Sequence, residues 1–399
     1  MAEAARLNVL VLNAISASGL ARLPAERYRV GKDVPDPAAV LLRSADMHKM
    51  VIPTSVRAIG RAGAGTNNIP VAQMSERGVP VFNAPGANAN AVKELVLAGM
   101  LMAARNLGPA LGFVAALKAD AGTAADLERA VEEGKKAFAG FELAGQTLGV
   151  IGLGKIGCLV ADAAIKLGMN VLGYDPEITV DAAWSLPSQV KRATSVNEVL
   201  RSAHFVSLHV PLVEATRDLV NDTNIGLMRQ GAVLLNFSRE GVVADAAMLE
   251  ALSTERLAYY VCDFPSAATL AHPRIIALPH LGASTREAEE NCAVMVVDQL
   301  RDYLEHGHVT NAVNFPNVSM ERESRWRVAI ANSNVPNMLG QISTTMANSG
   351  LNIHNMVNKS RGAMAYTLVD VDSPVADAVL ASLAAIGGVL CVRYLPGPG

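Results

Sequence analysis

QTLGVIGLGKIG, residues 146–157, decides the fold of this chain. A short apolar strand passes directly into Gly152, Gly154 and Gly157, and a helix-forming segment follows. Glycine suits these positions because the turn is tight, a pyrophosphate must approach the backbone, and the helix must lie close to the strand. Asp175 ends the next predicted strand, where a carboxylate accepts ribose hydroxyls and repels a 2′-phosphate. The segment therefore predicts an NAD-binding Rossmann domain.

Apolar runs alternate with helix-length segments on both sides of this loop, as is typical of α/β folds with doubly wound parallel sheets. The runs that continue the predicted Rossmann sheet are residues 169–175, 203–210, 231–238 and 274–280. A second set, residues 7–13, 39–44, 59–64 and 79–84, predicts a smaller flavodoxin-like domain. Residues 91–105 are expected to form a helix that connects the two domains, and 284–305 a further long helix.

The last part of the chain has a different pattern. From Arg325 onward the order is strand, helix, strand, strand, helix, strand, which is the ferredoxin-like βαββαβ arrangement. We therefore predict four parts: an α/β domain formed by 1–90 with 284–316, a Rossmann domain at 91–283, a linker at 317–324 and a ferredoxin-like domain at 325–399.

Composition excludes several classes of protein. The 399 residues are 51% hydrophobic and 18% charged, which excludes a disordered chain. The formal charge is −3 without a block of like charges, and no apolar run reaches the roughly 18 residues of a membrane span, so neither nucleic acid nor a membrane is an expected partner. The N-terminal residues lack a signal-peptide pattern, so we expect a cytoplasmic protein. The four cysteines are scattered, which predicts neither disulfides nor a metal site.

Two segments downstream of the glycine loop carry a specific resemblance. NFSREGVVAD (236–245) and PHLGAST (279–285) resemble the two signatures of the D-isomer-specific 2-hydroxyacid dehydrogenases. With LLRSADM (41–47), IGRAGAGTNNIP (59–70) and FNAPGANANAVKEL (82–95), the chain is similar over almost its whole length to the phosphoglycerate dehydrogenases of that family. Its C-terminal domain resembles the regulatory ACT domain that many members carry. The resemblance also implies that 1–90 with 284–316 is a discontinuous substrate-binding domain.

The resemblance implies an activity. It is the NAD-dependent oxidation of 3-phospho-D-glycerate, a small phosphorylated 2-hydroxy acid, to 3-phosphohydroxypyruvate, the first step of L-serine biosynthesis. His280 matches the general acid/base, and Arg239 matches the residue that holds the substrate carboxylate, a role that suits the planar guanidinium. Two alternatives are a dehydrogenase for another 2-hydroxy acid and a non-catalytic NAD-sensing regulator of the same family.

The resemblance also implies further contacts, which we state as expectations. The cofactor-binding residues are Gly152, Gly154, Lys155, Ile156, Gly157, Asp175, Pro211, Thr216, Asn236, Ser238, Asp263 and Gly282. The substrate-binding residues are Arg43, Ser44, Arg61, Ala64, Gly65, Asn88 and Lys93. An L-serine effector at the ACT domain would contact Asn332, Asn334 and Asn352. We also expect a homo-oligomer, a dimer or tetramer, with residues 91–105 and the ACT domain at subunit contacts.

The sequence departs from the family at one catalytic position. A glutamate between the arginine and the histidine normally supports the imidazole, but here no carboxylate follows Asp263 before His280. Three readings stay open: another acid supports His280, with Asp263, Glu287 and Glu289 as candidates; the imidazole acts without support; or activity is lost. In the ACT domain, Asn337 stands where the family has a glycine, so the alternative there is a domain that only dimerises.

Overall fold

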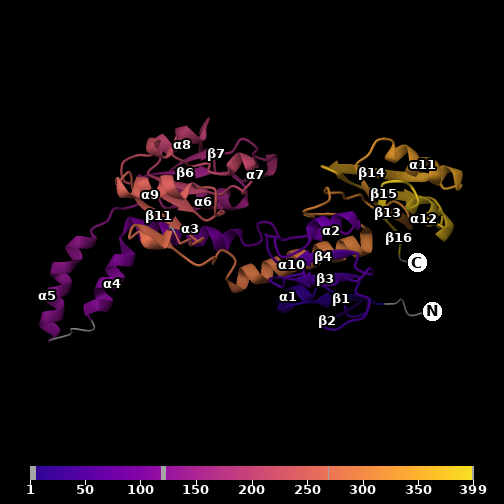
Figure 1. Ribbon diagram of the computed structural model, residues 1–399, viewed down its shortest axis with the longest axis horizontal. Helices are drawn as coiled ribbons and strands as arrows, with labels where there is room; N and C mark the ends of the chain where they lie inside the picture. Colours follow the sequence, from indigo (N-terminus) through magenta and orange to yellow (C-terminus); the bar gives the residue numbers. More distant parts are fainter. Residues whose placement is uncertain (1–5, 118–122, 268, 398–399) are drawn as a thin grey trace. The chain divides into compact units, whose positions relative to one another are not determined.

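The computed structural model describes residues 6–117, 123–267 and 269–397 (Figure 1). The chain divides into two compact units, Met1–Asn88 with Arg286–Gly399, and Ala89–Thr285. Each unit is described by itself below. The first contains a parallel sheet and an antiparallel sheet, and the second a parallel sheet, so the predicted α/β fold class is confirmed.

A seven-stranded parallel sheet forms the centre of the second unit. Its order is β12-β11-β10-β9-β6-β7-β8, so the strand order reverses between β6 and β9, as in a Rossmann fold. Two of its strands, β8 and β11, were absent from the runs that we selected in the sequence. The bounds are β6 Thr147–Ile151, β7 Asn170–Tyr174, β8 Lys191–Arg192, β9 Phe205–Leu208, β10 Ala232–Asn236, β11 Leu257–Cys262 and β12 Ile275–Ala277.

Helices cover both faces of this sheet. On one face, α3 (Ala89–Ala104) and α6 (Lys155–Lys166) share a core with β6 and β10. On the other face, α8 (Val196–Ser202) and α9 (Asp245–Ser253) pack in a second core. The other α-helices among the described residues of this unit are α7 (Val180–Ser185) and the pair α4 (Leu107–Leu117) and α5 (Ala124–Gly134), which extends away from the sheet in Figure 1.

Helix length and composition were compared with the requirements of a membrane span. Within the described ranges, no single helix is both long and apolar enough to cross a membrane. The helices α3 and α4 meet the requirement only when taken together, across a bend of 68°.

The first unit contains a five-stranded parallel sheet of order β2-β1-β3-β4-β5. The helices α1 (Ala17–Leu20) and α10 (Arg286–His306) cover one face, and α2 (Val71–Glu76) covers the other. The edge strand β2 was not among the predicted runs, because its exposed Arg29 interrupts the apolar pattern. The bounds are β1 Leu7–Val11, β2 Tyr28–Gly31, β3 Ala39–Leu42, β4 Ala58–Arg61 and β5 Val81–Phe82.

The C-terminal part of the first unit is an antiparallel sheet of order β14-β15-β13-β16. Its chain order matches the predicted βαββαβ pattern: β13 Trp326–Ser333, α11 Met338–Asn348, β14 Ile353–Arg361, β15 Met364–Val371, α12 Asp377–Ala384 and β16 Val389–Pro396. One face packs against α11 and α12, and the other contributes Tyr366 and Leu368 to the core shared with α10. The Tyr366 hydroxyl donates to the Gly307 carbonyl at 2.8 Å. This sheet is thus docked on the rest of the first unit.

The segment that we expected to be a linker is partly packed. Val318 and Met320 belong to the same core, and Val318 forms an isolated bridge with Val309. The domain bounds stay a prediction, and the two compact units are the division that the contacts define.

Candidate active site

The glycine loop between β6 and α6 leaves no room for side chains at two of its three glycines. Gly152 has a φ of +93°, and a Cβ there would lie 2.5 Å from the carbonyl oxygen of His209. A Cβ on Gly157 would lie 2.0 Å from the Gly152 carbonyl oxygen. At Gly154 a Cβ would meet no atom within 4 Å, so this glycine leaves open space at the start of α6. Gly152 and Gly157 are required by the close packing of the loop, and Gly154 leaves a space that a ligand can enter.

Asp175, directly after β7, faces this loop. Its Oδ2 accepts a hydrogen bond from the Leu153 amide at 2.8 Å, and its Oδ1 accepts one from the Glu177 amide at 2.9 Å. Each carboxylate oxygen keeps a further lone pair for a hydroxyl donor. Lys155 and Ile156 begin α6, so their backbone amides lie in its unpaired first turn. The open glycine, the helix start and the carboxylate together fit a dinucleotide with a free ribose diol.

The remaining predicted cofactor residues lie after the strands of the same sheet. Thr216 closes a turn after β9, where its hydroxyl donates to the Pro211 carbonyl and accepts from the Val213 amide. Sequence reasoning missed His209, which is also at this end of β9. Its Nε2 lies 2.9 Å from the Ser207 hydroxyl, its Nδ1 has no hydrogen-bond partner among the described residues, and burial lowers its pKa to about 4. Gly282 is buried in the loop after β12.

The side chain of Asn236, at the end of β10, organises the loop that carries Arg239. Its Nδ2 donates to the Arg239 carbonyl at 3.0 Å, and its Oδ1 accepts from the Ser238 hydroxyl at 2.8 Å. Arg239 donates from Nη1 to the Ser238 carbonyl at 2.6 Å, while the residue as a whole is exposed. The buried amide thus fixes the backbone, and the exposed guanidinium keeps donors for a carboxylate.

Asp263, directly after β11, is the acid that the structure places beside both candidate catalytic residues. It is 2% exposed, and its Oδ1 has no hydrogen-bond partner in the described part of the chain. Burial raises the pKa of Asp263, and the charges of His280 and then Arg239 oppose that rise. The His280 ring is exposed and meets the Phe264 ring edge-on, with centroids 4.7 Å apart. Asp263, Arg239 and His280 therefore form one electrostatic group.

The two other acids considered as support for His280 have cationic partners of their own. Glu289 Oε1 lies 2.6 Å from Arg43 Nη1, and Glu287 Oε1 lies 3.1 Å from Arg286 Nη2. Both are in the first unit. Asp263 and His280, in contrast, both belong to the second unit.

The predicted substrate residues of the first unit gather at the carboxyl ends of β3 and β4. Asn13, two residues after the end of β1, accepts from the Arg43 amide at 2.8 Å and donates to the Ser44 hydroxyl at 2.9 Å. Asn68 accepts from Arg61 Nε at 3.0 Å and donates to the Ala45 carbonyl at 2.7 Å. The sequence analysis missed both asparagines. Asn13 could have been selected because it is a polar residue that follows a largely apolar run.

The loop after β4 is also fixed by an asparagine. Asn83, directly after β5, donates to the Ala64 carbonyl at 2.5 Å, and Gly65 follows in the same loop. Asn88 is the last residue of the first of the two segments that form this unit. Lys93 belongs to the second unit, where it donates to Asn90 at 2.7 Å on the first turns of α3. Arg43, Ser44, Arg61, Ala64 and Gly65 thus share one end of the five-stranded sheet.

The predicted effector residues lie at one end of β13 and just before β14. Asn334 donates to the Gly362 carbonyl at 3.0 Å, and Asn352 is exposed. Asn332 is 1% exposed, and its Oδ1 has no partner among the described residues. Asn337, which stands where the family has glycine, has a φ of +63°. Asparagine tolerates this left-handed conformation better than other non-glycine residues, so the turn into α11 is kept.

Comparisons with known proteins identify the family of the chain. Residues 98–282 match the NAD-binding domain of the D-isomer specific 2-hydroxyacid dehydrogenases. The chain is 33% identical over 350 residues to D-3-phosphoglycerate dehydrogenase of Haemophilus influenzae, covering 85% of this chain and 81% of that protein. It is 35% identical over 303 residues to the enzyme of that name from Methanocaldococcus jannaschii, covering 74% of this chain but only about half, 54%, of that longer protein.

Solved structures show the same fold. NAD⁺-bound 3-phosphoglycerate dehydrogenase of Entamoeba histolytica superposes with a TM-score of 0.58 at 23% identity, covering 77% of this chain and 99% of that one. A glyoxylate reductase from Paecilomyes thermophila gives a TM-score of 0.62 at 23% identity, covering 77% and 98%. These likenesses extend over the parallel-sheet architecture.

Proposed function

The chain belongs to the D-isomer-specific 2-hydroxyacid dehydrogenases, and on that premise we propose that it oxidises 3-phospho-D-glycerate to 3-phosphohydroxypyruvate, the first step of L-serine biosynthesis. NAD is the cofactor of this family. One observation carries the proposal: Arg239 and His280 follow strands β10 and β12 of the same parallel sheet whose glycine loop, after β6, fits the dinucleotide.

The residues divide the work of the reaction. Arg239 binds the substrate carboxylate with its planar guanidinium, so that C2 is oriented for reaction. His280 takes the proton of the C2 hydroxyl as that bond becomes a carbonyl. The glycine loop and Asp175 would hold NAD, which would supply the acceptor for the hydride that leaves C2. Arg43 and Arg61, at the end of the five-stranded sheet, supply positive charge for the phosphate.

Asp263 is proposed as a positioning residue for His280 as well as a neighbour of the cofactor. A buried carboxylate beside an imidazole stabilises the protonated ring that forms in the oxidation. This role replaces the family's glutamate. In the variant Asp263→Asn, kcat for the reduction of 3-phosphohydroxypyruvate is expected to fall while KM for that substrate stays near the wild-type value, because the imidazole loses the group that positions it. An unchanged kcat with a raised KM for NADH would leave Asp263 a cofactor role only.

The assay is NADH consumption by the purified chain with 3-phosphohydroxypyruvate. His280→Ala should lower the rate by about 10²-fold or more. His272→Ala is the matched control, because its ring accepts a bond from the Arg274 amide in the same segment and lies outside the site. Equal rates for wild type and His280→Ala would refute the proposed mechanism. Turnover of glyoxylate or another 2-oxo acid in preference to the phosphorylated substrate would favour the sister-enzyme alternative.

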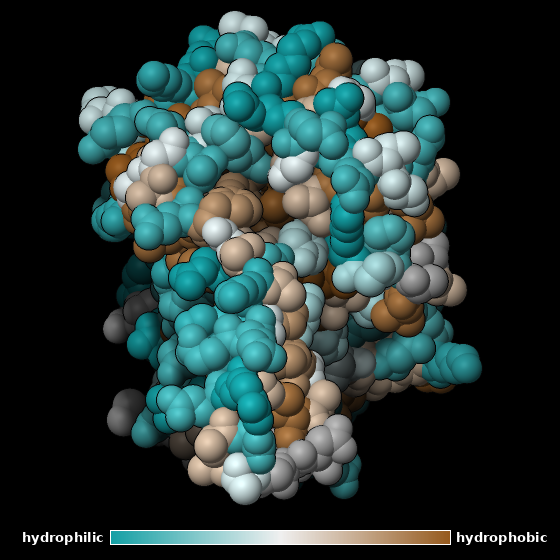
Figure 2. All heavy atoms as spheres, turned by 90° about the vertical axis from the view of Figure 1, so that its left-hand side faces the viewer, coloured by the Kyte–Doolittle hydropathy of each residue, from teal (hydrophilic) through white to brown (hydrophobic). Residues whose placement is uncertain are grey.

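We also propose a homo-oligomer, and α4 and α5 support it. Residues 91–105 and the ACT domain were the expected contacts, but within the described residues α4 has no buried side chain. Leu111 and Val114 of α4 are 69% and 49% exposed, and Leu127 of α5 is 42% exposed. Figure 2 shows a band of hydrophobic side chains on this side, flanked by hydrophilic ones. Such a surface is typical of a subunit contact.

The variant Leu111→Glu tests this contact. Light scattering should give a lower molar mass for Leu111→Glu than for the wild type.

L-Serine is the proposed effector of the C-terminal domain. The backbone-fixing bond of Asn334 and the buried, unpartnered Oδ1 of Asn332 support a small polar ligand at that end of β13. Equilibrium dialysis with L-serine tests it, with Asn352→Ala expected to weaken binding. Absence of binding to the wild type would reduce the domain to an assembly role. We also propose that the protein is cytoplasmic.

A further inference from the structure

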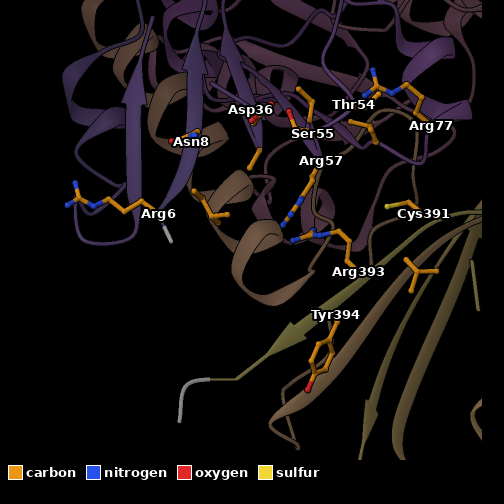
Figure 3. Close-up of a pocket in the computed structure, with 15 residues that line it drawn as sticks. Arg6, Asn8, Asp36, Thr54, Ser55, Arg57, Arg77, Cys391, Arg393 and Tyr394 are labelled. Carbon is orange, nitrogen blue, oxygen red and sulfur yellow. The ribbon is translucent and has the colours of Figure 1, made fainter. Parts of the chain in front are cut away.

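A cavity of about 580 Å³ lies in the first unit between the five-stranded sheet and β16 of the C-terminal sheet. This volume is within the usual range of small-molecule sites. Arg57, just before β4, and Arg393 of β16 line it, and Figure 3 shows their guanidinium groups pointing toward one another. Arg57 precedes β4, whereas Arg61 ends β4 and Arg43 follows β3, so the cavity lies at the opposite end of the five-stranded sheet from these two residues.

Arg393 is held in place by hydrogen bonds and has one N–H donor that they do not use. It is 7% exposed, and it donates from Nη1 to the Tyr303 carbonyl at 3.2 Å and from Nη2 to the Leu304 carbonyl at 3.0 Å. Its Cζ lies 4.4 Å from the Tyr303 ring centroid. Its buried Nε has no hydrogen-bond partner among the described residues. A buried, unsatisfied N–H on a cation is costly unless an anion accepts from it.

Arg57 faces this buried cation. Burial, and then the charge of Arg393, lower the pKa of Arg57. Asp36 is the acid among the residues that line the cavity, and it is not among the groups whose charge shifts the pKa of Arg57. Two guanidinium groups that converge inside a cavity repel each other unless an anion lies between them. Arginine is the side chain whose geometry suits phosphate oxygens.

We propose that this cavity is a binding site for a phosphate group, held between Arg57 and Arg393 and distinct from the catalytic site. Because Arg57 belongs to the parallel-sheet region and Arg393 to the C-terminal sheet, the bound anion joins the two regions. The ligand would be inorganic phosphate or the phosphoryl end of a small phosphomonoester. Its occupancy would stabilise the docked position of the C-terminal sheet.

The test uses the full chain and isothermal titration with inorganic phosphate in one arm and glycerol 3-phosphate in the other. Arg57→Gln is expected to weaken binding at least about tenfold, because it removes a charge-assisted contact. Arg29→Gln is the matched control, since Arg29 is an exposed arginine of β2 that does not line the cavity. Arg43→Gln separates the two sites: phosphate bound only at the catalytic loops would respond to Arg43→Gln and not to Arg57→Gln.

A second measurement reports on the cavity directly. Cys391 lines it, and the other three cysteines are buried, so a maleimide should label Cys391 first. Phosphate is expected to slow labelling of Cys391 in wild type and not in Arg57→Gln. Tighter binding of glycerol 3-phosphate than of phosphate identifies an ester as the ligand, and the reverse identifies the free ion. Equal phosphate affinity in wild type and Arg57→Gln, or no binding to the wild type, would overturn the proposal.

Discussion

The five-stranded and seven-stranded sheets are both parallel, both doubly wound and both covered on two faces, yet they place different chemistry at the same position. After β6 the chain turns through Gly152, Gly154 and Gly157 into the 12-residue helix α6. After β1 it passes through Asn13 into α1, which has four residues. The first connection opens space at a helix start, and the second supplies an amide that fixes the backbone of Arg43. Topology sets where a ligand can bind, and the loop residues set which ligand binds.

The largest expected effect concerns the loop of the seven-stranded sheet. Gly157→Ala places a Cβ 2.0 Å from a backbone oxygen, so strand and helix must separate. We expect the free energy of unfolding of the second unit to fall by about 3 kcal/mol or more, with loss of NADH binding. Chemical denaturation and NADH fluorescence titration measure the two effects.

Gly154→Ala is the matched control for this prediction. Its Cβ meets no atom within 4 Å, so the stability should stay within about 0.5 kcal/mol of wild type. Its affinity for NADH should still fall, because the methyl group occupies the ligand's space. Full NADH affinity in Gly154→Ala would mean that the open space of this loop is not the cofactor site.

The second prediction concerns pH and the polar residue at the end of β9. Burial lowers the pKa of His209 to about 4 in the folded state, against an ordinary value near 6.5. The neutral ring therefore contributes full stability above pH 6.5, and this contribution is lost as the pH falls through 4. We expect His209 alone to cost the second unit about 3 kcal/mol between pH 7 and pH 4.

Urea unfolding of His209→Asn at both pH values checks this expectation, since the variant should lose less stability on acidification than wild type. His48→Asn is the control from the five-stranded sheet, where the imidazole is exposed and bonds to the Asn67 carbonyl. An equal pH dependence in wild type and His209→Asn would show that the ring is not buried as a neutral group.

The contrast between the sheets also explains what the sequence could predict. The glycine loop, Asp175 and the βαββαβ order could be predicted because each is a local pattern whose residues lie close in sequence. The strand β11 was missed, although its residues LAYYVC include several that favour β-strands. Without β11, the sequence could not show that Asp263 follows a strand of the same sheet and is close enough for the charge of His280 to act on its pKa. Asn236 could be placed by its motif, but its bond to the Arg239 carbonyl is a property of the folded loop. The cavity at Arg57 joins residues more than 300 positions apart, which no local pattern reveals.

The third prediction tests the use of glycine in the five-stranded sheet. A Cβ on Gly60, in β4, would lie 2.6 Å from Leu300 Cδ1 and 2.9 Å from Val296 Cγ2 of α10. Because these are movable side-chain atoms, Gly60→Ala should destabilise the first unit by about 1–3 kcal/mol through overpacking. NADH affinity should be unchanged. Gly65→Ala is the control, since its nearest contact would be 3.7 Å away. A loss of NADH affinity in Gly60→Ala would contradict the expectation that this glycine serves only the packing of α10 on the sheet.

The smallest effect concerns the choice between NAD and NADP. Asp175 repels a 2′-phosphate by its charge, while its Oδ2 also accepts from the Leu153 amide. Asp175→Asn keeps an oxygen for that amide and removes the charge, so the loop should stay folded while the preference for NADH over NADPH falls about tenfold, or about 1.4 kcal/mol. Glu177→Gln is the control, because it neutralises an exposed carboxylate two residues later. Steady-state affinities for both cofactors measure the ratio. An unchanged preference in Asp175→Asn would assign discrimination to the shape of the loop and leave the carboxylate a purely structural role.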